Sequence, residues 1–305
     1  MQSTQTAKQE NSPYLQLLLV GVYAIGGLFV AMLIGFAVAF IFYGPVLIKD
    51  TSWMTGNNPK LVGALKILLT AQQIGLFLTP AVLLSLTEGR KPHHFYGLKK
   101  PRLDILFFVL LIMVCSTPLM GWINETNQKM VLPEFLKGVE QWMRRMEDEG
   151  AKTTAALLKM TSIGDFILTL FVVAVVPAIC EEFLFRGALQ RTFLRWIRNP
   201  HIAIWVSAII FSTIHFQFYG FFPRLFLGAA FGYIYFWTGS LWYTIFAHFL
   251  NNGFAVALSW YFQRNNMPMK GDEEIPGQWY GYIISAILTL ALFKLLKDKT
   301  FRQER

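Results

Sequence analysis

The sequence has little charge for its length. Only 15% of its 305 residues are Asp, Glu, Lys or Arg, whereas 54% are hydrophobic and the mean hydropathy is +0.44. Soluble domains carry about 25% charged residues. This shortage excludes an ordinary soluble domain and predicts a polytopic membrane protein of the all-α class.

Cysteine and several catalytic motifs are also scarce or missing. Two cysteines, Cys115 and Cys180, lie in apolar runs, with no CxxC spacing and no disulfide framework. There is no His-Glu-x-x-His pair for a zinc protease and no Gly-x-Ser-x-Gly nucleophile elbow. The net charge is +9, but no basic patch with stacking aromatics stands outside the apolar runs, so nucleic acid is not an expected partner.

Long apolar runs are what the sequence does have. A spanning helix needs about 20 mostly apolar residues. We expect about eight transmembrane helices around an intramembrane polar cavity, in a single integral-membrane domain over 1–305. The predicted spans are 15–43, 61–86, 103–120, 163 to the glutamates near 181, 201–218, 224–237, 241–262 and 279–296.

The basic residues between these runs predict the orientation. Lys and Arg gather in 87–102, in 186–200 and in the tail after 293, which eight spans place on one side together with the N-terminus. Because cytoplasmic loops collect Lys and Arg, we expect both termini in the cytoplasm. The loop 263–278, which carries three acidic residues, is expected on the other side.

One sizeable segment, 121–162, lies outside the predicted spans. From 134 to 160 it is compatible with a helix that has Phe135, Val139, Trp142, Met143 and Met146 at helical spacings. Such an amphipathic helix is predicted to lie on the membrane surface or to cover a cavity, and a solvated connector is the alternative.

Three polar clusters interrupt the apolar second half, within 163–262. In the first, Glu182 and Arg186 are four residues apart, so that one helical face can pair them. Glu181 points about 100° away and lacks that cation. A carboxylate buried without a cation has a raised pKa and suits a general base.

The other two clusters contain histidines. The second is Phe211-Ser212-Thr213-Ile214-His215, and the third places His248 and Asn252 four residues apart. Each cluster alone can be a headgroup contact or an interhelical hydrogen bond. Three clusters on three helices instead predict one site that activates water and stabilises an oxyanion. For Glu181 to lie at the same depth in the membrane as His215, the fourth helix should continue past Arg186 to about residue 194.

These motifs, Glu-Glu-x-x-x-Arg, Phe-x-x-x-His and His-x-x-x-Asn in this order, resemble the CAAX protease and bacteriocin-processing family. That family, also called ABI, comprises intramembrane glutamate endopeptidases and includes the Ras-converting CAAX endopeptidases. The resemblance implies that Glu181 and His215 activate a water, that His248 and Asn252 hold the oxyanion, and that Glu182 and Arg186 orient Glu181. It implies no cofactor, a substrate that is a membrane-associated peptide or protein, and a place in a bacterial plasma membrane.

Two other functions fit the same residues. Glu181, His215 and His248 with a water would suit zinc, which predicts a metal-dependent membrane hydrolase. A non-enzymatic regulatory, immunity or scaffold protein would keep the polar cluster for structure alone.

Overall fold

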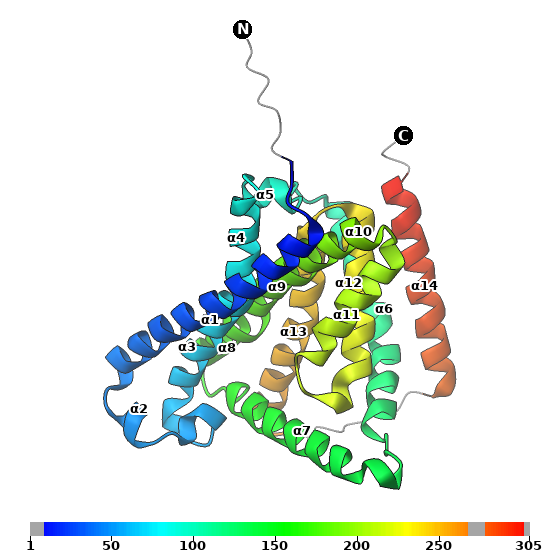
Figure 1. Ribbon diagram of the computed structural model, residues 1–305. Helices are drawn as coiled ribbons and strands as arrows, with labels where there is room; N and C mark the ends of the chain where they lie inside the picture. Colours follow the sequence, from blue (N-terminus) through cyan, green and yellow to red (C-terminus); the bar gives the residue numbers. More distant parts are fainter. Residues whose placement is uncertain (1–8, 268–277, 302–305) are drawn as a thin grey trace.

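The computed structural model describes residues 9–267 and 278–301, and within them the chain is helical without strands (Figure 1). The first half contains α1 (Pro13–Tyr43), α2 (Val46–Lys49), η1 (Ser52–Thr55), η2 (Pro59–Leu61), α3 (Val62–Gln73), η3 (Ile74–Leu78), α4 (Thr79–Thr87), α5 (Pro92–Phe95), α6 (Leu103–Gln128), η4 (Glu134–Leu136) and α7 (Lys137–Leu157). The second half contains α8 (Ile163–Leu170), η5 (Phe171–Val175), α9 (Val176–Glu182), η6 (Phe183–Gln190), α10 (Arg191–Ile197), α11 (Pro200–Thr213), η7 (Phe218–Gly220), α12 (Phe221–Thr238), α13 (Leu241–Arg264) and α14 (Trp279–Phe301).

Among these residues, five continuous helical segments are long and apolar enough to cross a membrane: Pro13–Tyr43, Pro59–Thr87, Leu103–Gln128, Ile163–Ile197 and Trp279–Thr300. α11 is a shorter apolar helix, and α12 and α13 stand beside it in the same bundle (Figure 1). The chain is therefore an all-helical integral membrane protein, and its architecture is compatible with the expected eight spans.

The fourth span is long, as the expected depth of Glu181 in the membrane required. α8, η5, α9, η6 and α10 form one continuous helix, Ile163–Ile197, with 35 residues. Two of its parts, η5 and η6, are π-helical. Short π segments inside α-helices occur frequently at functional sites. Here they flank the two glutamates, which lie in the middle of the helix rather than at its end.

Two predicted boundaries were wrong. α6 does not stop near 120 but continues to Gln128, because its polar last turn is held by Asn127, which bonds Phe218 and Phe222. α11 ends at Thr213 instead of about 218. His215 therefore lies in the turn after this helix, next to Phe216, whose φ is 52°.

The segment after α6 contains α7, which runs across one end of the bundle (Figure 1). Of the expected apolar face only Met143 is buried, whereas Phe135, Val139 and Trp142 are exposed. Glu147 Oε2 accepts from the backbone N–H of Tyr219 at 3.0 Å, and Trp142 contacts Phe218. These contacts seat α7 on the α11–α12 connection.

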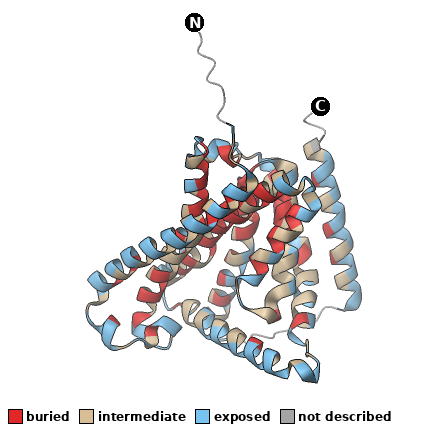
Figure 2. Cartoon of the chain, viewed as in Figure 1, coloured by how far each residue is buried: buried red, intermediate tan, exposed pale blue. Residues whose placement is uncertain are grey.

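The interior of the bundle is buried and the outward faces of its helices are exposed (Figure 2). The outer residues of α1 and α14 are large and apolar, as lipid contact requires. α12 approaches α11 closely through Gly228, whose backbone lies against Ala208 and Phe211, and through Gly232, which lies against Ile204. The small-residue pattern thus serves helix packing, as such patterns do in membranes.

The first and last described residues lie at the same end of the bundle, opposite α7 (Figure 1). Glu10, just before α1, forms ion pairs there with Arg90, Arg191 and Arg195 at 3.1, 2.6 and 3.0 Å. Burial alone would raise the pKa of Glu10, but the hydrogen bond from Arg191 and the three positive charges outweigh it and lower that pKa. Most of the expected acidic loop, 268–277, lies outside the described residues.

The depressed pKa of Glu10 predicts a pH dependence. The ion pairs stabilise the N-terminal segment above the ordinary pKa of 4.5, and this stabilisation is lost as the pH falls through the lower folded value. We expect amide protection factors at residues 11–16 to fall on acidification. Glu10→Gln should lower them already at neutral pH, whereas Glu134→Gln, on exposed Glu134, should not. Unchanged protection in Glu10→Gln would contradict this assignment.

Candidate active site

The first cluster is a buried ion pair on one helical face. Arg186 Nη1 donates to Glu182 Oε1 at 2.7 Å, and the two side chains are 2% and 0% exposed. Arg186 Nη2 donates to the carbonyl of Gly228 at 3.0 Å. The guanidinium also lies over the rings of Phe211 and Phe231, at 4.9 and 5.3 Å from their centroids. Arg186 is thus held by charge, by backbone and by aromatic faces, which suits a planar guanidinium.

His248 joins the two glutamates. Its Nδ1 lies 2.9 Å from Glu182 Oε1, and its Nε2 lies 3.8 Å from Glu181 Oε2. Because a carboxylate accepts, Nδ1 carries the hydrogen in this contact. Donation from Nε2 would require the doubly protonated ring. The sequence paired Glu182 with Arg186 alone, and the structure adds His248 as a second donor to the same oxygen.

His215 reaches the site from the turn after α11. Its Nδ1 donates to the carbonyl of Phe211 at 2.7 Å, which leaves Nε2 of the neutral ring as an acceptor. The Phe211 ring packs edge-on against both His215 and His248, with centroids 5.0 and 6.2 Å apart. Phe211 therefore packs against both histidine rings and restricts their orientation.

Asn252 makes a contact that the sequence did not predict. Its Nδ2 donates to the carbonyl of Val173 at 3.1 Å. In a regular helix that carbonyl would accept from the residue four positions on, which is Pro177, and proline has no N–H. Asn252 thus satisfies a carbonyl that Pro177 and the π-helical η5 leave open. One N–H of the same amide remains for a further acceptor.

Glu181 has a neighbour that sequence reasoning missed. Gln73 Nε2 donates to Glu181 Oε1 at 3.0 Å, from a helix 108 residues earlier in the chain. Gln73 Oε1 is buried and accepts no hydrogen bond from the residues that the structure describes. The available signal was the pair Gln72-Gln73 inside an apolar span. Glu181 itself is 5% exposed and forms no ion pair with Lys or Arg in the described part of the chain.

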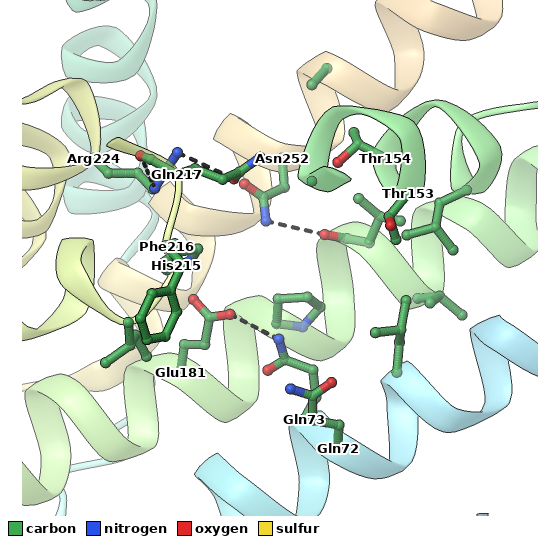
Figure 3. Close-up of a pocket in the computed structure, with 18 of the residues that line it drawn as sticks. Gln72, Gln73, Thr153, Thr154, Glu181, His215, Phe216, Gln217, Arg224 and Asn252 are labelled. Atoms are coloured by element: carbon green, nitrogen blue, oxygen red, sulfur yellow. Dashed lines mark hydrogen bonds between the residues drawn. The ribbon is translucent and has the colours of Figure 1, made fainter. Parts of the chain in front are cut away.

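All four residues predicted to be catalytic line one cavity of ≈ 1020 Å³. Figure 3 shows Glu181 with Gln73 on one side and His215 on the other. The cavity extends from Glu181 to α7, where residues between Met146 and Leu157, together with Leu158 just after the helix, form part of its wall. Its polar wall consists of Thr55, Asn57, Gln72, Gln73, Glu149, Lys152, Thr153, Thr154, Glu181, His215, Gln217, Arg224, His248, Asn251 and Asn252.

The His, Asp and Glu side chains that line the cavity do not form a group of metal ligands. Over 9–267 and 278–301, no three His, Cys, Asp or Glu side chains form a group that would hold a metal ion. Glu181, His215 and His248, the set considered for zinc, therefore do not form such a group here. Both cysteines are free thiols and lie outside the cavity wall.

Fold and site together define an integral membrane protein whose helices bury a carboxylate–histidine cluster in a polar cavity. Residues 163–254 match the family model described as "Type II CAAX prenyl endopeptidase Rce1-like". This segment contains all three motifs, and over it the chain is similar to the Rce1-like family. The resemblance of the motifs is thereby confirmed.

The chain is also similar to a curated protein. "Uncharacterized protein YpbD" of Bacillus subtilis (strain 168) is 29% identical over 133 residues, which are 42% of this chain and 63% of that protein. The match thus spans just under two thirds of the relative's length. No solved structure matches the chain.

Proposed function

We propose that the protein is an intramembrane endopeptidase that hydrolyses a peptide bond of a membrane-associated peptide or protein. The observation that carries this proposal is the convergence of Glu181, His215, His248 and Asn252 on one cavity. The Rce1-like match supports the same class of reaction. Burying several ionisable groups within a membrane bundle is costly and is usually retained for function.

In the proposed mechanism, a water lies between Glu181 and His215. Glu181 accepts a proton from it as general base, and Nε2 of His215 accepts its second hydrogen bond. The hydroxide attacks the scissile carbonyl, and the proton held by Glu181 passes to the leaving amine. Gln73 keeps Glu181 Oε1 occupied, so that Oε2 is the oxygen left for the water.

The negative charge of the tetrahedral intermediate needs donors. Nε2 of His248 lies beside Glu181 and donates when the ring carries both protons, and the free N–H of Asn252 offers the second donor. Glu182 contacts Nδ1 of His248 and pairs with Arg186, and this chain of contacts orients the His248 ring. With the termini in the cytoplasm of a bacterial cell, the cavity opens towards α7 and the outer side of the plasma membrane.

Hydrolysis is tested by isotope incorporation. The full chain in lipid nanodiscs is incubated with a mixed peptide library in H₂¹⁸O, and the products are read by mass spectrometry. We expect new C-termini that carry one ¹⁸O from the attacking water. Absence of labelled products, with peptides intact, would contradict the proposal.

The mechanism also predicts the effect of losing Gln73. Gln73→Leu removes the donor that orients Glu181, and we expect kcat/KM to fall about 10- to 100-fold with a shifted acidic limb of the pH–rate profile. Gln72→Leu is the matched comparison, because Gln72 lines the same cavity but makes no hydrogen bond to Glu181. Equal losses in both variants, without any pH shift, would reduce Gln73 to a packing role.

A metal-dependent reaction is checked directly. We expect elemental analysis of protein purified without chelator to find no stoichiometric zinc. We also expect the ¹⁸O-labelled products to form at the same rate after chelator treatment. A loss of labelling that zinc alone restores would favour the metal-dependent hydrolase.

A further inference from the structure

Arg224 is a cation in the cavity wall that the proposed catalytic set does not use. It lies in the first turn of α12, and its guanidinium is only partly exposed. Nη1 donates to the backbone carbonyl of Gln217 and Nη2 to its side-chain Oε1, both at 3.2 Å. Within the described residues, Arg224 forms no ion pair with a carboxylate.

Arg186 shows what a structural arginine looks like in this bundle. It has a carboxylate at 2.7 Å, a backbone carbonyl at 3.0 Å and aromatic faces on both sides. Arg224 has two neutral acceptors only. It also stands near a helix N-terminus, where the macrodipole is positive and disfavours a cation. Among the described residues, no ion pair offsets this unfavourable placement of a cation.

The surroundings of Arg224 leave it room. A side chain at Gly220 would collide with the guanidinium, and a Cβ at Gly150 of α7 would approach Gln217 Nε2 to 2.6 Å. Two glycines thus allow Gln217 and Arg224 to lie together against α7. In Figure 3 this pair lies at the cavity wall near Asn252.

The other charges that face Arg224 do not neutralise it. Glu147 and Glu181 act on Arg224 only at longer range. Glu147 already accepts from the backbone of Tyr219, and Glu181 from Gln73. Lys152 and Glu149, also in the wall, add one charge of each sign, and Glu149 forms no ion pair with Arg224. An anion entering the cavity would find Arg224 with donors still available, since a guanidinium has five.

The geometry points to Arg224 as a specificity-determining residue that binds a carboxylate of the substrate inside the cavity. The carboxylate belongs to an Asp or Glu side chain or to the C-terminus of the peptide, because the guanidinium recognises the same planar group in both. This inference rests on the proposed function, for which it defines a substrate class: peptides with a carboxylate close to the scissile bond.

A measurement of peptide binding without turnover tests the carboxylate-binding role of Arg224. The probe is a random hexapeptide library in three matched forms: free C-terminal acids without Asp or Glu, amides with one Glu, and amides without Asp or Glu. Full-length Glu181→Gln protein in nanodiscs is equilibrated with all three, and retained peptides are counted by mass spectrometry. We expect one acidic form to be retained at least about tenfold over the neutral amides.

When Arg224→Gln is added to the Glu181→Gln protein, the preference for the acidic form should be abolished. Arg224→Lys in the same background should keep part of it. Arg145→Gln, on the exposed arginine of α7, is the matched control and should leave it unchanged. Retention of the free acids alone identifies a C-terminal carboxylate as the bound group. Retention of the amides with one Glu identifies a side-chain carboxylate. Equal retention of all three forms, or a preference that survives Arg224→Gln, would overturn the inference.

The two proposals fail separately. Cleavage by the wild-type protein without acid preference would leave the endopeptidase standing and remove the carboxylate site. Acid binding that depends on Arg224, in a wild-type protein that forms no ¹⁸O-labelled product, would retain the site and remove the endopeptidase.

Discussion

Glu181→Gln should abolish peptide hydrolysis while the protein stays folded. The amide has nearly the same shape and can still bond Gln73, but it cannot accept a proton from water. Loss of a general base typically costs about 10²–10⁴-fold in rate. The measurement is the rate of ¹⁸O-labelled product formation by purified protein in nanodiscs.

The comparison for this variant is Glu134→Gln, which changes an exposed glutamate far from the cavity wall. It should hydrolyse at the wild-type rate. Both variants should elute as wild-type protein does and melt at similar temperatures. A folded Glu181→Gln protein with wild-type turnover would remove Glu181 as the base and, with it, the proposed mechanism. A variant that unfolds instead would favour a structural role of the cluster, as in a scaffold protein.

Arg186→Met should be the most destabilising single substitution in the site. Arg186 and Glu182 are almost completely buried, so the variant leaves a carboxylate without its cation. Breaking a buried ion pair by removing one partner costs about 3–5 kcal/mol. Arg186 also bonds the carbonyl of Gly228, and this contact between the fourth span and α12 is lost as well. The free energy of unfolding would be measured by denaturant titration in detergent.

Two further variants separate charge from packing. Arg144→Met breaks the pair between Arg144 and Glu140, which has the same i, i+4 spacing and the same 2.7 Å contact, but whose side chains are 48% and 14% exposed. Exposed pairs contribute little, so its stability should stay close to wild type. Arg186→Met combined with Glu182→Gln removes the stranded charge and should recover part of the loss. Equal effects of Arg186→Met and Arg144→Met would contradict the buried-charge explanation.

His248 couples these two expectations. It contacts Glu182 through Nδ1 and approaches Glu181 through Nε2. Damage to the Glu182–Arg186 pair should therefore reach the chemistry through the orientation of this ring. For that reason Arg186→Met is expected to lower activity in whatever fraction remains folded, whereas Glu181→Gln lowers activity alone.

The sequence by itself determined the class of fold and the residues of the cluster. Long apolar runs demand helices in a membrane, because backbone polar groups have no other partners there. Helical periodicity placed Glu182 and Arg186 on one face, and they form an ion pair. It also separated Glu181 from that cation. These are local consequences of 3.6 residues per turn, and they need no knowledge of how helices cross.

Only the tertiary structure decided which helices meet and what their side chains do there. Gln73 reaches Glu181 from 108 residues away, and no local spacing encodes that approach. His215 lies outside the predicted helix because the chain turns after Thr213, and in this turn Phe216 has a positive φ. Asn252 serves the carbonyl that Pro177 leaves open, a contact fixed by how α13 packs on η5. Periodicity selects the face of a helix, whereas side-chain packing between helices selects the partner.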